Sequence, residues 1–172
     1  MKKKLKILLV SSEVVPFAKT GGLADVAGAL PKALFKAGLD VRVAMPKYKS
    51  IDDTKFGLRQ LGEIEVPMGD AKEKAVIKSC EIPNTQIPVY FIGNTDYFSR
   101  EQLYRTAEGD YPDNCRRFTF FSRALMEMLG FVKWIPDVIH CNDWQSALIP
   151  AYIKTIYKGT ELGKIGTVFT IH

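Results

Sequence analysis

The sequence predicts an α/β domain with a Rossmann-like, mostly parallel sheet, flanking helices and a small antiparallel hairpin. Short apolar runs of strand length alternate with longer stretches whose apolar residues recur three and four positions apart, which is the pattern of β-α-β units. Between two such units, residues 61–93 change to extended runs, the first of which alternates polar and apolar side chains. The chain has 172 residues, 47% of them hydrophobic, so it is sized for one domain over 1–172.

The expected elements follow one another in simple order. Strands are expected at about 6–11, 41–45, 63–66, 75–82, 89–92, 138–141 and 167–171. Helices are expected at about 22–37, 113–129 and 144–158. Pro31 should kink the first helix and Gly38 suits its C-cap, while Asp113 is the candidate N-cap of the second helix and Gly159 closes the third. The first two strands should be parallel, joined by a right-handed crossover, and the third and fourth should form a hairpin that leans on the sheet.

Residues 94–112 are expected to form a long polar loop, and loops of this length in a compact domain are usually functional or mobile. Tyr97, Tyr104 and Tyr111 lie in it among charged residues, and such aromatic rings can stack on sugars. They are therefore possible contacts for a carbohydrate acceptor. The alternative is a partly ordered lid whose aromatic rings dock on their own domain.

The charge distribution argues against a nucleic-acid or membrane partner. The net charge is +5, and four of the 24 basic residues gather at the N-terminus as Lys2, Lys3, Lys4 and Lys6, so no basic face is indicated. This start resembles a signal peptide, but its apolar run is too short and ends at Ser11. No stretch approaches the ~20 apolar residues of a membrane-spanning helix.

The cysteines and histidines favour reduced thiols and no metal. Cys80, Cys115 and Cys141 are widely spaced and lack a C-x-x-C motif, which indicates a cytoplasmic protein. Only two histidines are present, without a carboxylate–histidine cluster, so no metal site and no cofactor are expected.

An anion site is predicted where the first strand leads through a glycine-bearing loop into the first helix. Backbone N–H groups and the positive end of the helix dipole would face the space above the strand, and Lys19 adds a charge beside Gly21 and Gly22. The alternative is that the glycines only let the chain turn. Neither G-x-G-x-x-G nor G-x-x-x-x-G-K-[ST] is present, so no dinucleotide fold or P-loop is supported by motif.

Four polar clusters follow strands of the expected sheet. Because ligands bind beyond the carboxyl ends of parallel strands, these clusters should converge on one edge. Each has a simpler reading: Asp143 could be an N-cap, Asp25 could favour the positive end of its helix, and His140 could be a hydrogen-bonded core residue. The clusters are Lys19 with Gly21 and Gly22, Asn94 with Asp96, His140 with Asn142 and Asp143, and His172.

Three motifs resemble those of the bacterial glycogen synthases and plant starch synthases, which are retaining glucosyltransferases built from two facing Rossmann-like domains, the GT-B architecture. They stand in the family's order: K-T-G-G-L-A-D-V at 19–26 after S-S-E-x-x-P, P-D-V-I-H-C-N-D-W at 136–144, and T-V-F-T-I-H at 167–172. The resemblance implies a truncated N-terminal, acceptor-side domain without the C-terminal domain that holds the adenine pocket. It also implies ADP-glucose and α-1,4-glucan as partners, and a piece that is inactive alone.

The resemblance also implies roles for individual residues. Lys19 matches the lysine at the donor phosphates, where a cation stabilises the charge on the departing diphosphate, and Asp25 faces the nucleotide-sugar cleft. Asp143 lies by the glucosyl and acceptor region, and His172 is the active-site histidine; these two are the candidate catalytic residues. Asn142 departs from the family, where many members carry histidine. The alternatives are another retaining GT-B glycosyltransferase with a different donor, and a carbohydrate- or phosphate-binding module that does not catalyse.

Overall fold

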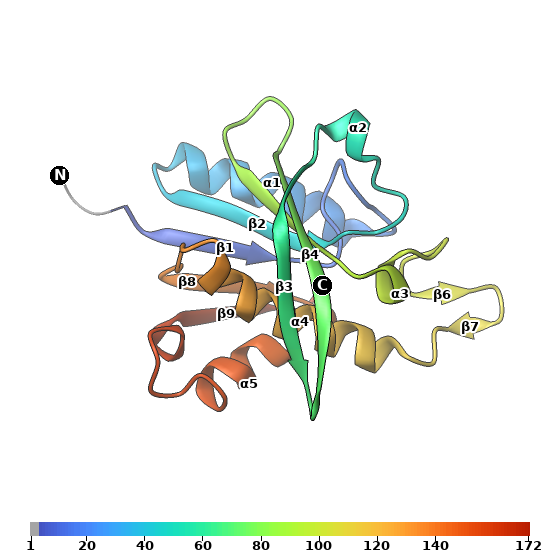
Figure 1. Ribbon diagram of the computed structural model, residues 1–172. Helices are drawn as coiled ribbons and strands as arrows, with labels where there is room; N and C mark the ends of the chain where they lie inside the picture. Colours follow the sequence, from blue (N-terminus) through green and yellow to red (C-terminus); the bar gives the residue numbers. More distant parts are fainter. Residues whose placement is uncertain (1–3) are drawn as a thin grey trace.

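In a computed structural model of the chain, which describes residues 4–172, the main strands form one seven-stranded sheet in the order β3-β4-β5-β2-β1-β8-β9 (Figure 1). The five strands from β5 to β9 in this order run parallel, whereas β3 and β4 pair antiparallel with each other and β4 pairs antiparallel with β5. The predicted α/β fold is therefore confirmed. The strands are β1 (Lys6–Val10), β2 (Asp40–Pro46), β3 (Arg59–Met68), β4 (Ala71–Glu81), β5 (Pro88–Gly93), β8 (Val138–Asn142) and β9 (Gly166–Thr170), with β6 (Arg105–Thr106) and β7 (Gly109–Asp110) in a separate hairpin.

The helices cover both faces of the sheet. Helix α1 connects β1 to β2 and lies on one face, whereas α4 and α5 lie on the other (Figure 1). Crossovers between parallel strands are right-handed, so the direction in which the chain moves across the sheet decides which face the connecting helix covers. The chain moves toward β5 through α1 and in the opposite direction, toward β9, through α4 and α5, so these helices lie on opposite faces. The helices are α1 (Gly22–Lys36), α2 (Asp53–Phe56), α3 (Thr95–Phe98), α4 (Asn114–Phe131) and α5 (Leu148–Lys154), with single 3₁₀ turns at Trp144–Ser146 and Leu162–Lys164.

Helix α1 packs closely on the loop that precedes it. Leu23, Ala24 and Ala27 are buried on its inner face. The periodicity predicts Leu23 and Ala27, but Val26, which has the same helical spacing, is exposed at the cleft. At Gly28 a Cβ atom would lie 2.8 Å from the Val15 carbonyl oxygen, so only glycine lets the helix and the loop approach this closely. The helix continues through Pro31, and Gly38 follows its C-cap with a φ of +89°.

The predicted hairpin belongs to the main sheet instead of leaning on it. Its strands β3 and β4 are longer than predicted, and β4 pairs with β5 over residues 76–81. The hairpin curves past the end of the parallel sheet, and α4 packs against it (Figure 1).

The helix predicted over 144–158 is confirmed only over Leu148–Lys154. A continuous helix would need an N–H at Pro150 to bond the Ser146 carbonyl, and proline has none. The chain instead makes a 3₁₀ turn and starts α5 at Leu148, which leaves Pro150 in the first turn, where no N–H is required. The helix ends at Lys154, and Gly159 follows at a φ of +90°.

Residues 94–112 are ordered by a buried arginine. Arg117 of α4 is fully buried and donates to the carbonyl oxygens of Tyr97 and Leu103 at 2.7 and 3.0 Å and to the Asn114 side chain at 2.6 Å. The segment contains the short helix α3 and the two-residue strands β6 and β7, so it is more regular than the long polar loop that the sequence predicts. Asp113 precedes α4 without a side-chain capping bond. Its carboxylate pairs with Arg100, which lowers the pKa of Asp113.

Candidate active site

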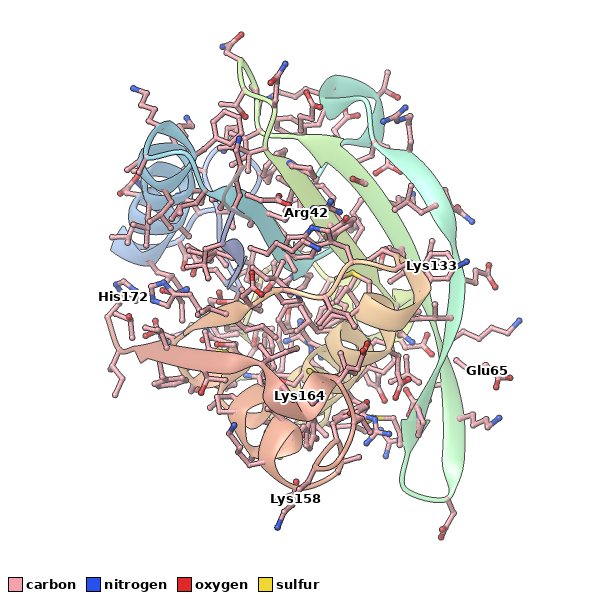
Figure 2. All side chains as sticks on the ribbon, turned by 90° about the vertical axis from the view of Figure 1, so that its left-hand side faces the viewer. Arg42, Glu65, Lys133, Lys158, Lys164 and His172 are labelled. Carbon is pink, nitrogen blue, oxygen red and sulfur yellow. The ribbon has the colours of Figure 1, made fainter. Side chains whose placement is uncertain are left out.

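An open cleft of about 500 Å³ lies at the carboxyl ends of β1, β8 and β9, between the start of α1 and the segment after β9. Of the four polar clusters that the sequence predicts at one edge, Gly21, Gly22, Asp143 and His172 line this cleft. Asn94, at the end of β5, instead lines a separate pocket with Lys47 and Lys49. Figure 2 shows His172 beyond the end of β9, on the side of the molecule where α1 packs. The cleft is lined by Glu13, Gly21, Gly22, Leu23, Val26, Asp143, Gln145 and His172.

Glu13 holds the glycine loop in place. The residue is 3% exposed. Its carboxylate accepts the backbone N–H groups of Thr20 and Gly21, the Thr20 hydroxyl at 2.6 Å and the Tyr104 hydroxyl at 2.9 Å. A carboxylate that accepts this many hydrogen bonds fixes the backbone around it. Sequence reasoning missed Glu13, although a charged residue three positions after a buried strand is an available signal.

The N-terminus of α1 faces the cleft through Gly22 and Leu23. Gly21 is its N-cap and makes no side-chain capping bond. The Gly21 N–H is used by Glu13, so the helix amides available to an anion begin at Gly22. A Cβ atom at either Gly21 or Gly22 would meet no protein atom within 4 Å, so the glycines leave open space above the loop.

Lys19 and Asp25 are paired with each other. The Lys19 ammonium lies 2.7 Å from both Asp25 carboxylate oxygens, and about half of each side chain is exposed. Neither residue is among those that line the cleft, but both flank the loop and helix start that form its wall.

Asp143 has a strained backbone and contacts the segment after β9. Its φ and ψ are 56° and 177°, a region that residues other than glycine rarely adopt. Its N–H donates to the Thr170 carbonyl at 2.9 Å, and its Oδ1 accepts the His172 backbone N–H at 2.7 Å. Its side chain does not cap the following turn, so the N-cap interpretation is wrong.

The two histidines have different surroundings. His140 is half-buried, and its Nε2 lies 2.8 Å from the Thr170 hydroxyl, so it is hydrogen-bonded as predicted but does not belong to the core. Burial, with a smaller contribution from the charge of His172, lowers the pKa of His140. His172 Nε2 lies 3.0 Å from the Asn142 side-chain oxygen, at the mouth of the cleft.

The three tyrosines of 94–112 contact their own domain. Tyr97 is buried and bonded to Glu73 and Arg116, and Tyr111 packs its ring against Arg100 and Arg117. Tyr104 is the one that reaches the cleft wall, through Ser12 and Glu13.

Trp144 is the exposed aromatic beside the site. Its side chain is 52% exposed and packs on Phe118 and Tyr104 with ring centroids 4.9 and 6.3 Å away. Trp144 belongs to the 136–144 motif, but the sequence does not show that Trp144 is exposed whereas Tyr97 is buried.

Within residues 4–172, no group of three or more His, Cys, Asp or Glu side chains is placed to hold a metal ion. No helix among these residues has the length and apolar character needed to cross a membrane. Lys2 and Lys3 of the basic N-terminal cluster lie outside the described residues.

The fold and the site together define a Rossmann-like α/β domain with a ligand cleft at the carboxyl ends of its parallel strands. The model of the starch synthase catalytic domain family matches residues 6–172, and the chain belongs to this family. It is 47% identical over 171 residues to a glycogen synthase of Geotalea daltonii and 48% identical over 183 residues to one of Desulforudis audaxviator. These alignments cover 98% and 99% of the chain and 35% of each relative, so the chain spans about a third of their length.

A solved structure is similar throughout the chain. The catalytic domain of starch synthase IV from Arabidopsis thaliana, bound to ADP and acarbose, superposes with a TM-score of 0.88 at 32% identity. The match covers 99% of this chain and 34% of that one.

Proposed function

We propose that this chain is the N-terminal, acceptor-side part of a glycogen synthase that transfers glucose from ADP-glucose to the non-reducing end of an α-1,4-glucan with retention of configuration. The observation that carries the proposal is the convergence of Gly22, Asp143 and His172 on one cleft at the strand ends. Membership of the starch synthase family and the ADP-bound structural relative support it.

Each part of the cleft suits a different part of this reaction. Glucosyl transfer builds negative charge on the departing diphosphate, and the α1 amides with Lys19 beside them suit that end. Positive charge grows at the anomeric carbon, and the Asp143 carboxylate, with His172 beside it, suits the sugar. Trp144, exposed next to Asp143, offers a face on which an acceptor sugar can stack.

Residues 1–172 alone are not expected to elongate glucan. In this proposal the adenine pocket and further catalytic groups come from a second domain, and the longer length of the relatives supports this. A cytoplasmic location belongs to the proposal too, supported by the three free cysteines.

The test has two parts. The reading frame is sequenced past the codon for His172, and the encoded protein is assayed for incorporation of labelled glucose into glycogen from ADP-glucose and from UDP-glucose. ADP-glucose-dependent elongation by the longer protein, and none by residues 1–172, is the expected result. Preference for another donor would favour a different retaining GT-B enzyme, and glucan binding without any transfer would favour a binding module.

A matched pair of variants tests whether the donor diphosphate binds beside Lys19. Lys19→Ala should lower the rate of transfer, whereas Lys32→Ala, which removes an exposed lysine further along α1, should not. Equal rates for the two variants would remove Lys19 from the proposed site.

A further inference from the structure

The side-chain amide of Asn142 is fixed from two directions. Asn142 is the last residue of β8 and only 1% exposed. Its Nδ2 donates to the carbonyl oxygen of Val10, at the end of β1, at 3.0 Å and to that of His140 at 3.2 Å. Both acceptors are backbone oxygens, which cannot donate, so the nitrogen of the amide must face them. The orientation of the amide is thereby determined by the sheet.

The other end of the amide faces the histidine. Asn142 Oδ1 lies 3.0 Å from His172 Nε2. An amide oxygen only accepts hydrogen bonds, so Nε2 must carry a proton and donate it. In a neutral imidazole the proton on Nε2 leaves Nδ1 unprotonated. The ring of His172 then has one acceptor, Nδ1, on a side chain that lines the cleft.

A second hydrogen bond holds the backbone of His172. The Asp143 carboxylate accepts the His172 N–H at 2.7 Å, so neighbouring side chains at the end of β8 hold both the main chain and the ring of His172. The Asp143 contact holds the main chain of His172 and the Asn142 contact holds one edge of its ring, which is the pattern of a supported functional side chain.

We propose that Asn142 is a positioning residue that holds the imidazole of His172 in the Nε2–H tautomer, so that His172 meets a ligand in this cleft as a hydrogen-bond acceptor through Nδ1. This deepens the proposed function of the same cleft. A neutral acceptor in this place binds a hydroxyl group, such as one on a sugar, and does not transfer a proton to it. Asn142 thus has a defined part in the site.

The charged and titratable groups around His172 are few. His140 lies on β8 and interacts electrostatically with His172, while Glu13 and Asp143 line the same cleft from the loop after β1 and the turn after β8. Glu13 is engaged by the glycine loop and Asp143 by the His172 backbone. Asn142 does not line the cleft, but among the described residues its side chain is the one that is hydrogen-bonded to the His172 ring.

The tautomer is measured directly on residues 1–172 by ¹⁵N NMR of the histidine rings at pH 8. The spectrum of the unmodified chain should show His172 protonated at Nε2. An Nδ1–H signal, or an equal mixture, would overturn the proposal without any variant. Because this readout needs no glucosyl transfer, its failure is distinct from failure of the proposed function.

Variants test the origin of the preference. In Asn142→Leu the tautomer preference of His172 should be lost. In Asn142→Asp a carboxylate oxygen replaces the amide oxygen and still accepts from Nε2, so the Nε2–H tautomer should persist. Asn84→Asp, which adds the same charge in a distant exposed turn, should also leave the tautomer unchanged and controls for the added charge. A tautomer that persists in Asn142→Leu, or one that is lost in Asn142→Asp, would contradict the proposal.

Discussion

The ammonium group of Lys19 lies 2.7 Å from both carboxylate oxygens of Asp25, across the loop that leads into α1. The side chains are 52% and 57% exposed. A pair this exposed stabilises a fold little, roughly 0.2–1 kcal/mol. An incoming phosphate would therefore compete with Asp25 for Lys19 at low cost to the fold.

Under the proposed function, Asp25→Asn should raise the affinity of the longer protein for ADP-glucose about two- to fivefold, because the amide no longer neutralises Lys19. The free energy of unfolding should hardly change. Titration calorimetry with ADP-glucose, beside urea denaturation, measures both. Asp70→Asn removes an exposed carboxylate from the β3–β4 turn and serves as the control for net charge. A loss of affinity in Asp25→Asn alone would mean that Asp25 contacts the ligand itself.

Gly28 and Gly22 should respond differently to an added methyl group. In Gly28→Ala the Cβ atom would lie 2.8 Å from the Val15 carbonyl oxygen, so the glycine loop must shift, at a cost of roughly 1–3 kcal/mol. In Gly22→Ala it would meet no protein atom within 4 Å, so stability should be kept while a phosphate is obstructed. Denaturation and ADP-glucose binding of the two variants check this. Full binding by Gly22→Ala would show that the ligand stays away from the start of α1.

The spacing of apolar residues predicted the helices whose buried side chains lie on one continuous face. The inner face of α1, at Leu23 and Ala27, and the buried stripe of α4 follow from spacing alone. The convergence of Gly22 and His172 on one cleft followed from the strand assignment and the rule for parallel sheets.

The remaining features depend on contacts between distant residues. Glu13 acquires its role from Thr20, Gly21 and Tyr104, the last of which is 91 positions away. Arg117 orders the segment before α4 from inside the core, although its sequence pattern is that of any helical arginine. Neither the burial of a charged side chain nor its partners can be read from spacing, so the structure of residues 94–112 was not predictable.

His140 makes the stability of the fold depend on pH. Burial, and then the charge of His172, lowers the pKa of His140 below its ordinary value of 6.5. The unfolded chain therefore binds more protons than the folded one as the pH falls below 6.5. The contribution of His140 to stability is full above that pH and is lost progressively on acidification, until the pH reaches the lowered pKa.

Urea denaturation between pH 5 and pH 8 tests this dependence. The free energy of unfolding should fall more steeply on acidification in the unmodified protein than in His140→Gln, whose side chain keeps a hydrogen-bonding partner for Thr170 without titrating. His172→Gln removes the exposed histidine and serves as the control. In this variant most of the pH dependence of the free energy of unfolding should remain. Parallel curves for the unmodified protein and His140→Gln would contradict the assignment.

The Asp143→Gly variant should have a higher free energy of unfolding than the Asp143→Ala variant. Its φ of 56° with a ψ of 177° costs a residue with a Cβ atom about 1–3 kcal/mol, and glycine avoids this cost. Both substitutions remove the carboxylate that accepts the His172 N–H, so the difference between them isolates the backbone strain. Asp143→Gly should therefore unfold at higher urea concentration than Asp143→Ala.

The control is Asp110, which has the ordinary extended backbone of β7. There the usual order should hold, with Ala more stable than Gly by roughly 0.5–1 kcal/mol. Both Asp143 variants should lose glucosyl transfer in the longer protein to the same degree if the carboxylate acts on the sugar. If Asp143→Gly is instead no more stable than Asp143→Ala, the backbone at this position is not strained. If Asp143→Gly keeps transfer, the carboxylate is not part of the reaction, and the unusual backbone serves only to join β8 to the turn that follows.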